Sequence, residues 1–202
     1  MTELQIAFKK AAEGDDPGAL AAAAYNLYNR VFSSLTAFPV LLLKKPASAF
    51  TPEKCLVALH GMEVVGCALL ADVSVYRPDF EGLSAKFGLA AEEKMKMVSS
   101  QYSIELPLYE VGSVCVDPGY RMRGIARGLY RYVDDITGSN VYAIITADNH
   151  ASRAAIRSAG YVPIPSSAHS VNFTRDDDGC AVPEPSGDYI VHAELFRPVC
   201  VK

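Results

Sequence analysis

The chain has 202 residues, of which 50% are hydrophobic and 21% are charged, and its formal net charge is -4. This composition excludes a disordered protein, and the length suits one domain with a substantial core. The small negative charge argues against nonspecific nucleic-acid binding and slightly favours a cationic substrate. No apolar stretch is long enough to span a bilayer, and the start, MTELQIAFKKAAEGDD, has no signal-peptide pattern, so we expect a cytoplasmic protein with no membrane partner.

The five cysteines carry no metal-binding pattern. They form no C-x-x-C pair and no Cys/His cluster with zinc spacing. Because their number is odd and no export signal is visible, we expect reduced thiols, several of them buried in strands, and no bound metal. These residues are Cys55, Cys67, Cys115, Cys180 and Cys200.

The first half of the chain predicts a helix and an antiparallel hairpin. Residues 4–11 (LQIAFKKA) suit a first strand, and residues 17–32, rich in alanine and leucine with a proline at the start, are typical of a helix. Residues 54–76 form two apolar runs joined at a His-Gly pair, which indicates a hairpin. Residues 78–104 make a long connection, which we expect to be an insertion on the substrate side that forms a lid or a binding loop.

The second half alternates strands and helices. We expect strands at residues 108–116 and 141–149, each followed by a helix, at residues 124–137 and 150–160. The second of these helices ends at a glycine, which is a common helix stop. This order indicates neighbouring strand–helix units with some parallel pairing.

The C-terminal part begins with a short strand at YVPIP and continues through a polar loop at residues 175–188 to a final strand at residues 189–196. The hairpin in the first half requires antiparallel pairing, whereas the second half requires a parallel pair. The predicted fold class is therefore α/β, an α+β mixed sheet with helices on its faces.

A small basic turn joins the strand at residues 108–116 to the following helix. Asp117-Pro118-Gly119 stops the strand, and residues 121–126 (RMRGIA) lead into the helix. A helix start carries unpaired main-chain N–H groups and a partial positive charge, glycine allows close approach of the backbone, and arginines add hydrogen bonds. The turn is therefore a candidate phosphate site, although it fits neither the P-loop pattern nor G-x-G-x-x-G. The alternative is an ordinary strand-to-helix turn with solvated arginines.

The turn matches the pattern Arg/Gln-x-x-Gly-x-Gly/Ala at Arg121, Gly124 and Ala126, and here the sequence resembles the GNAT superfamily of acyl-CoA-dependent N-acetyltransferases. In that family the turn cradles the pyrophosphate of coenzyme A (CoA) with main-chain amides. One of Arg123 and Arg127 is expected to meet a CoA phosphate. The resemblance implies a CoA site that includes Arg121, Met122, Arg123, Gly124, Ile125, Ala126 and Arg127.

A second segment, NHASRAAIRSAGY, supports the same resemblance. Its Asn149, Ser152, Gly160 and Tyr161 match the family's Asn-x-x-Ala/Ser and Gly-Phe/Tyr positions, and VALHGMEVVGCALL resembles the family's second and third strands. The resemblance implies a single GNAT-type domain over residues 1–202. The implied fold is a central, mostly antiparallel sheet with a splayed parallel pair and flanking helices, and Asn149 and Ser152 join the implied CoA site.

The resemblance also implies how acetyl transfer would work. The family's fourth strand parts from its fifth, and the pantetheine arm of acetyl-CoA, the acyl donor, binds exposed backbone of the fourth strand. A main-chain N–H there polarises the thioester carbonyl, and the acetyl group passes directly to an amine in a ternary complex. In this sequence the backbone segment comprises Ser113, Val114, Cys115 and Val116.

Glu110 is the candidate general base. It lies eleven positions before Arg121, a spacing found in family members that use a strand glutamate to deprotonate the amine. An isolated carboxylate titrates at about 4, so a glutamate that acts as a general base at neutral pH needs partial burial or a water relay. The alternative is that Glu110 is a structural residue, in solvent or in a salt bridge; Glu105 is a weaker candidate base.

The general acid departs from the family pattern. The family often places a tyrosine on the helix after the fifth strand, and the corresponding residue here is Ile156, which cannot donate a proton. Ser152, one turn earlier on the same face, is a poor catalytic substitute, and water is an equal candidate.

These observations predict an N-acetyltransferase that moves an acetyl group from acetyl-CoA to a primary amine. The alternatives are a catalytically idle acyl-CoA-binding module with a regulatory role, which the missing tyrosine favours, and an enzyme that transfers a different acyl group. The acceptor is open among small metabolites, antibiotics, polyamines and protein amines, and a homodimer is left open as well.

Overall fold

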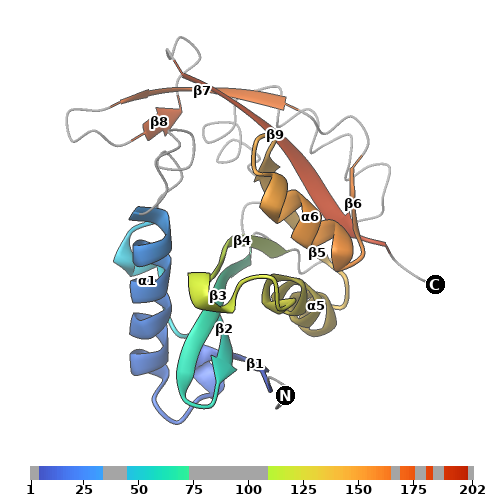
Figure 1. Cartoon of the computed structure of the whole chain (residues 1–202). Coiled ribbons are helices and arrows are strands. Elements are labelled where there is room, and N and C mark those ends of the chain that lie inside the picture. Colours follow the sequence, from blue (N-terminus) through green and yellow to red (C-terminus); the bar gives the residue numbers. More distant parts are fainter. Residues whose placement is uncertain are drawn as a thin grey trace.

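The computed structural model of the protein describes residues 5–33, 45–72, 109–164, 169–175, 181–183 and 189–199 (Figure 1). The expected insertion at residues 78–104 lies outside these ranges, as do Glu105, Cys180 and Cys200. None of the helices in these ranges is long and apolar enough to cross a membrane.

The described elements follow the order expected from the sequence in most places. The helices are α1 (Pro17–Ser33), α5 (Ile125–Thr137) and α6 (His150–Ser158), with short 3-10 turns η1 (Ala11–Glu13), η2 (Ala47–Ala49) and η4 (Pro118–Tyr120). The strands are β1 (Ala7–Lys10), β2 (Cys55–His60), β3 (Glu63–Asp72), β4 (Tyr109–Val116), β5 (Val141–Thr146), β6 (Tyr161–Pro163), β7 (His169–Arg175), β8 (Ala181–Pro183) and β9 (Tyr189–Pro198).

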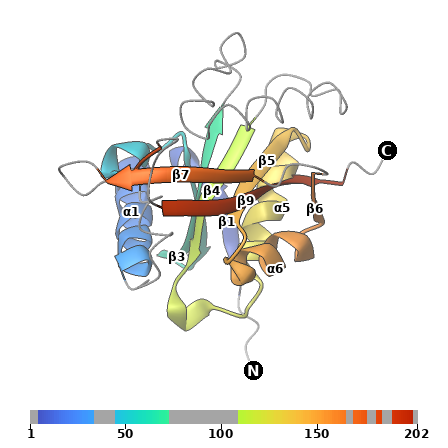
Figure 2. The same ribbon diagram turned by 90° about the horizontal axis from the view of Figure 1, so that it is seen from above.

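The described strands join in one mixed sheet with the order β1-β2-β3-β4-β5-β9-β7-β8, and β6 pairs with β9. Neighbours from β1 to β4 are antiparallel, β4 and β5 are parallel, and the pairs beyond β5 are antiparallel again. Figure 2 shows β7 and β9 side by side, running across the direction of β3 and β4. The predicted mixed α/β class, mostly antiparallel with one splayed parallel pair, is confirmed within the described part of the chain.

Two apolar cores lie on opposite faces of the sheet, with α1 on one side and α5 on the other (Figure 1). Strand β2 shows why both faces are filled, because its buried run CLVAL alternates between them. Cys55, Val57 and Leu59 join the core under α1, which we call the α1-side core, whereas Leu56 and Ala58 join the core under α5 and α6, the α5-side core. A strand buried on both faces reads as a continuous apolar run rather than an alternating one.

Helix α5 packs closely on the sheet because it carries a glycine at the contact. A Cβ at Gly128 would lie 2.2 Å from Cζ of Phe8 on β1, so a larger residue there would force the Phe8 ring to move. The helix ends at Gly138, whose φ of 59° gives a left-handed C-cap. Ile125, Leu129 and Val133 are one turn apart and bury the same face in the α5-side core.

The C-terminal region differs from the sequence prediction. The polar loop expected at residues 175–188 contains strand β8, and β7 before it was not predicted. Both strands depend on antiparallel pairing with distant partners, which local pattern does not reveal. Strand β5 ends at Thr146 rather than at Asn149, because Asn149 caps the next helix instead of continuing the strand.

Candidate active site

The parallel strands β4 and β5 pair only at their first two residues. The partners are Tyr109 with Val141 and Glu110 with Tyr142, and no further pair joins the two strands. From residue 111 onward, β4 pairs with β3 alone among the described strands. Since alternate residues of a strand direct N–H and C=O groups to each edge, part of the β4 main chain faces the parted side without a strand partner.

Strand β4 contains a bulge just beyond the point where the two strands part. Gly112 pairs with Leu69 and Cys115 with Cys67, so β4 carries one extra residue between these pairs. Ser113 lies in this stretch with a φ of 52°, a conformation that costs a residue other than glycine about 1–3 kcal/mol. A bulge leaves an unpaired residue and redirects main-chain groups, so it exposes backbone polar groups of β4 to a ligand.

Tyr28 of α1 braces the bulge from the α1 side. Its side chain is fully buried, and its hydroxyl hydrogen-bonds the side chain of Ser113 and accepts the main-chain N–H of Lys45 at 2.7 Å. Burial raises the pKa of Tyr28 to about 12, and the hydrogen bonds from Lys45 and Ser113 oppose this rise. The strained Ser113 is therefore held by a neutral, buried tyrosine.

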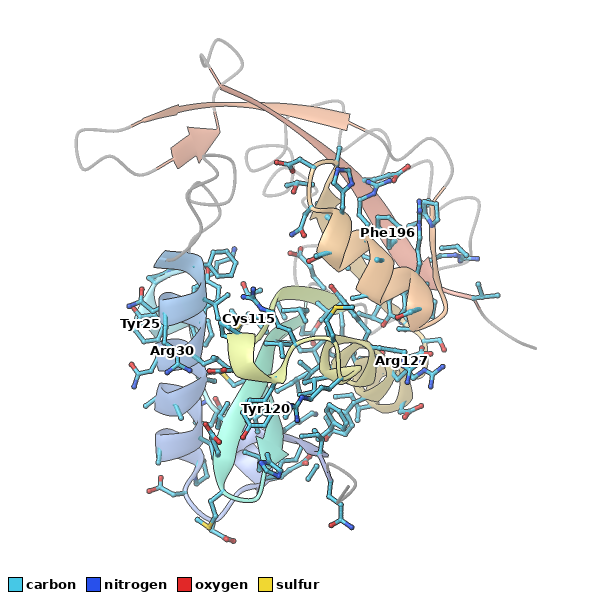
Figure 3. The ribbon with its side chains drawn as sticks, viewed as in Figure 1. Tyr25, Arg30, Cys115, Tyr120, Arg127 and Phe196 are labelled. Carbon is cyan, nitrogen blue, oxygen red and sulfur yellow. The ribbon has the colours of Figure 1, made fainter. Side chains whose placement is uncertain are left out.

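The side chains of the bulge region point into the two cores rather than toward the parted strands. Cys115 lies between the sheet and α1 (Figure 3), with its Sγ 3.2 Å from Sγ of Cys67. The hydrogen bond with Cys115, followed by burial, raises the pKa of Cys67 well above the usual thiol range. Val114 and Val116 pack against the α5-side core. Because Val114 and Val116 are apolar and partly buried, their main chain is the part that can hydrogen-bond a ligand.

The basic turn after β4 presents free main-chain amides at the start of α5. Gly124 is the N-cap with a φ of 79°, and it provides no side-chain cap. The first helical hydrogen bond runs from Gly128 N–H to Gly124 C=O at 2.9 Å. The N–H groups of Ile125, Ala126 and Arg127 thus have no partner within the helix, which is the arrangement that binds anions.

Three arginines surround this helix start. Arg127 folds over the turn, and its guanidinium lies 3.5 Å from where a Cβ of Gly124 would be. Arg123 stacks over the ring of Tyr120 at 5.6 Å, and Arg121 Nε donates to Val116 C=O at 3.4 Å. Met122 has a φ of 62° and a fully exposed side chain. All three arginine side chains can approach a phosphate.

The turn is braced by contacts from two other elements. Asp117 caps η4 by accepting Gly119 N–H at 2.8 Å, and Arg30 of α1 forms an ion pair with the same carboxylate (Figure 3). Tyr120 donates its hydroxyl to Glu63 of the β2–β3 hairpin at 2.9 Å. These bonds tie the turn to α1 and to the hairpin, so it is pre-formed.

Glu110 lies at the point where β4 and β5 part. Its Oε2 accepts the hydroxyl of Tyr142, its partner on β5, at 3.1 Å. Its Oε1 is 4.0 Å from where a Cβ of Gly112 would stand, so the carboxylate extends along β4 toward the bulge. The half-buried Glu110 therefore lies beside the backbone segment that the sequence predicted for the acyl donor.

The second predicted motif occupies structural positions at the start of α6. Asn149 is the N-cap, and its Oδ1 accepts Ser152 N–H at 3.0 Å. Ile156 is fully buried in the α5-side core, and buried Tyr161 donates its hydroxyl to Tyr130 C=O at 3.2 Å. A CoA contact of Asn149 or the half-buried Ser152 stays a prediction.

Sequence reasoning missed two tyrosines at this site, Tyr28 and Tyr142. Neither belongs to a motif, and each forms a hydrogen bond with a residue that is distant in the sequence. Among the described residues no group of three or more His, Cys, Asp or Glu could hold a metal ion.

The structure thus brings together two parted parallel strands, a bulged strand edge and a helix start with unpaired main-chain amides. A family model described as the Acetyltransferase (GNAT) family matches residues 21–161. The chain belongs to this family and is an acyl-CoA-dependent N-acyltransferase with acetyl-CoA as the acyl donor. Comparison with curated proteins gives no match.

Solved structures show the same fold at low sequence identity. The mosquito arylalkylamine N-acetyltransferase like 5b is 14% identical with a TM-score of 0.59, and the match covers 96% of this chain and all of that one. The putative acetyltransferase yncA from Salmonella typhimurium, solved with its cofactor acetyl-CoA, is 16% identical with a TM-score of 0.54, over 97% of this chain and 93% of that one. The ribosomal-protein-alanine N-acetyltransferase from Brucella melitensis is 18% identical with a TM-score of 0.51, over 97% and 99%.

Proposed function

We propose that the protein transfers the acetyl group of acetyl-CoA directly to a primary amine in a ternary complex, with Glu110 as general base. The observation that carries the proposal is the end of β4–β5 pairing at Glu110 and Tyr142. The Glu110 carboxylate lies at one end of the free β4 edge, and the start of α5, with its unpaired main-chain amides, follows the other end.

The described residues fit acetyl-CoA in two places. The amides of Ile125, Ala126 and Arg127 would hold the pyrophosphate, with Arg121 and Arg123 beside them. The pantetheine arm would bond the main chain of the bulged segment, where Cys115 is buried in the α1-side core and Val114 and Val116 pack partly buried against the α5-side core.

The chemistry requires a proton acceptor and a donor to the developing oxyanion. Acetyl-CoA supplies a thioester whose carbonyl carbon accepts the amine nitrogen and whose thiolate leaves. Glu110 takes the proton of the ammonium, directly or through one water, which makes the nitrogen nucleophilic. A main-chain N–H at the Ser113 bulge stabilises the oxyanion that forms on the carbonyl oxygen.

Protonation of the leaving thiolate does not come from α6 at the usual tyrosine position. Ile156 is apolar and fully buried there, so water or the proton collected from the amine serves instead. Ser152 is half-buried at the start of the helix and is the side-chain candidate on that face. A CoA thiol is acidic enough to leave with little assistance.

The acceptor class that we propose is a primary amine. The names arylalkylamine N-acetyltransferase and ribosomal-protein-alanine N-acetyltransferase of two structural neighbours both specify an amine acceptor. We also propose a reducing compartment, the cytoplasm, because the five cysteines are odd in number and form no C-x-x-C pair.

The test is a free-thiol release assay with acetyl-CoA over a panel of primary amines, together with calorimetry of acetyl-CoA binding. Glu110→Gln keeps the shape of the side chain and removes the base, so we expect turnover to fall by about 10²–10⁴-fold with little change in acetyl-CoA affinity. Full turnover in the variant would contradict the role of Glu110. Binding without thiol release for any amine would instead indicate an idle acyl-CoA-binding module.

A further inference from the structure

We propose that Tyr142 is a positioning residue that aims the Glu110 carboxylate at the bulge of β4. This inference rests on the proposed function, because it assigns Tyr142 a role only if Glu110 acts as the base. The hydroxyl of Tyr142 holds one carboxylate oxygen and leaves the other oxygen free to take the proton.

The register of the two strands brings this pair together. Glu110 and Tyr142 are the second and last pair between β4 and β5, so they mark the point where the strands part. The Tyr142 hydroxyl donates to Glu110 Oε2 at 3.1 Å, and the tyrosine is only 3% exposed. A buried side chain in a packed strand has few rotamers, so its hydroxyl is a fixed anchor for the longer and more flexible glutamate.

The second carboxylate oxygen points along the strand toward the bulge. Oε1 lies 4.0 Å from the position that a Cβ of Gly112 would take, and Gly112 immediately precedes Ser113. Glycine within a strand is unfavourable and often marks a place where a ligand approaches the backbone. Here it leaves the space beside Oε1 free of a side chain from β4.

Tyr142 can act only as a donor to Glu110 at working pH. Burial, followed by the charge of Glu110 and the hydrogen bond to it, raises the pKa of Tyr142 well above the usual range. A hydroxyl that holds its proton so strongly is a poor acid for a leaving thiolate. The Tyr142 hydroxyl therefore serves Glu110 as a hydrogen-bond donor and does not supply the proton of the thiol.

A double-mutant cycle tests whether Tyr142 acts through Glu110. Tyr142→Phe keeps the ring and removes the hydroxyl, and we expect kcat for the most reactive amine of the panel to fall by about tenfold, with unchanged acetyl-CoA affinity. In the Glu110→Gln background, the same substitution should change kcat by less than about twofold, because the carboxylate that it positions is already gone. If the Glu110→Gln rate is too low to measure, Glu110→Asp is the background, because its shorter side chain withdraws the carboxylate from Tyr142.

Tyr161→Phe is the matched control. It removes a buried tyrosine hydroxyl that donates to Tyr130 C=O at 3.2 Å, away from Glu110, so it should affect stability in the same way and leave kcat unchanged. An equal loss from Tyr142→Phe in both backgrounds, or no loss in either, would overturn the inference and leave the role of Glu110 intact. Full turnover in Glu110→Gln alone would overturn the proposed base and the inference with it.

Discussion

The turn at the start of α5 can be tested with two glycines at opposite ends of the same helix. Gly124 is the N-cap with a φ of 79°, and Gly138 is the C-cap with a φ of 59°. A Cβ at Gly138 would meet nothing within 4 Å, and a Cβ at Gly124 would meet only the flexible Arg127 guanidinium, at 3.5 Å. An alanine side chain therefore fits at either position, but the left-handed backbone conformation there is strained for alanine.

The two alanine variants should have similar stability and different affinity. Left-handed backbone costs alanine about 1–2 kcal/mol at each position, so urea unfolding should show similar losses. Gly124→Ala also adds a methyl group next to the Arg127 guanidinium at the helix start, where we propose that the phosphate binds. If the phosphate loses one charge-assisted hydrogen bond, worth about 1.5–3 kcal/mol, the Kd for acetyl-CoA should rise by roughly 10-fold to 100-fold.

Calorimetry with acetyl-CoA on the wild type, Gly124→Ala and Gly138→Ala measures the difference. We expect weaker binding for Gly124→Ala alone, and loss of detectable binding for Gly124→Asp, because a carboxylate there repels the phosphates as well. Unchanged affinity in Gly124→Ala and Gly124→Asp would refute the assignment of the phosphate site to this turn. Equal weakening in the Gly138→Ala variant would show that loss of helix stability, not loss of the anion site, explains the effect.

Two further predictions concern buried groups of the α1-side core. Burial raises the pKa of Cys55 from 9.0 to about 12. The neutral buried thiol therefore stabilises the fold fully below pH 9, and this stabilisation is lost as the pH rises toward 12, because the thiol of the unfolded chain ionises first. Between pH 8 and pH 10 the free energy of unfolding of the wild type should fall by about 1.4 kcal/mol more than that of Cys55→Ala, measured by urea titration, and parallel curves would contradict this. Tyr28→Phe removes the hydroxyl that hydrogen-bonds Lys45 and Ser113. The free energy of unfolding should therefore fall by about 1 kcal/mol, and turnover should slow. Tyr25→Phe is the control, because Tyr25 lies on the same helix and its ring packs edge-on against Phe50. Equal effects of both variants would show that the Ser113 contact is unimportant.

Local sequence was sufficient for the units whose signals lie within a few residues. The hairpin of β2 and β3, helix α1, and the β4–α5 and β5–α6 units were predicted from turn residues and apolar runs. The same holds for the turn at residues 121–126, because a strand end, a glycine and a helix start are adjacent in the chain. These features predicted the family, which the family model confirms, and a phosphate site, which stays a prediction.

The predictions were incomplete where a residue's role depends on a partner far along the chain. Strands β7 and β8 were missed because they depend on pairing with β9 and with each other. Tyr28 was not predicted to lie against Ser113, although it falls in the predicted helix. A helix pattern shows which face is apolar but not which strand the face will meet.

The sequence by itself determined the order of strands and helices apart from β7 and β8, and it proposed the turn at residues 121–126 as a phosphate site and Glu110 as the base. Only the tertiary structure decided that β4 and β5 part after Glu110 and that β4 contains a bulge at Ser113. It also decided that the Tyr142 hydroxyl hydrogen-bonds the Glu110 carboxylate. The physical reason is that register and bulges are properties of a strand and its neighbour together. A shift by one residue would move Tyr142 to the other face of the sheet, and only the packing of both cores selects the observed register.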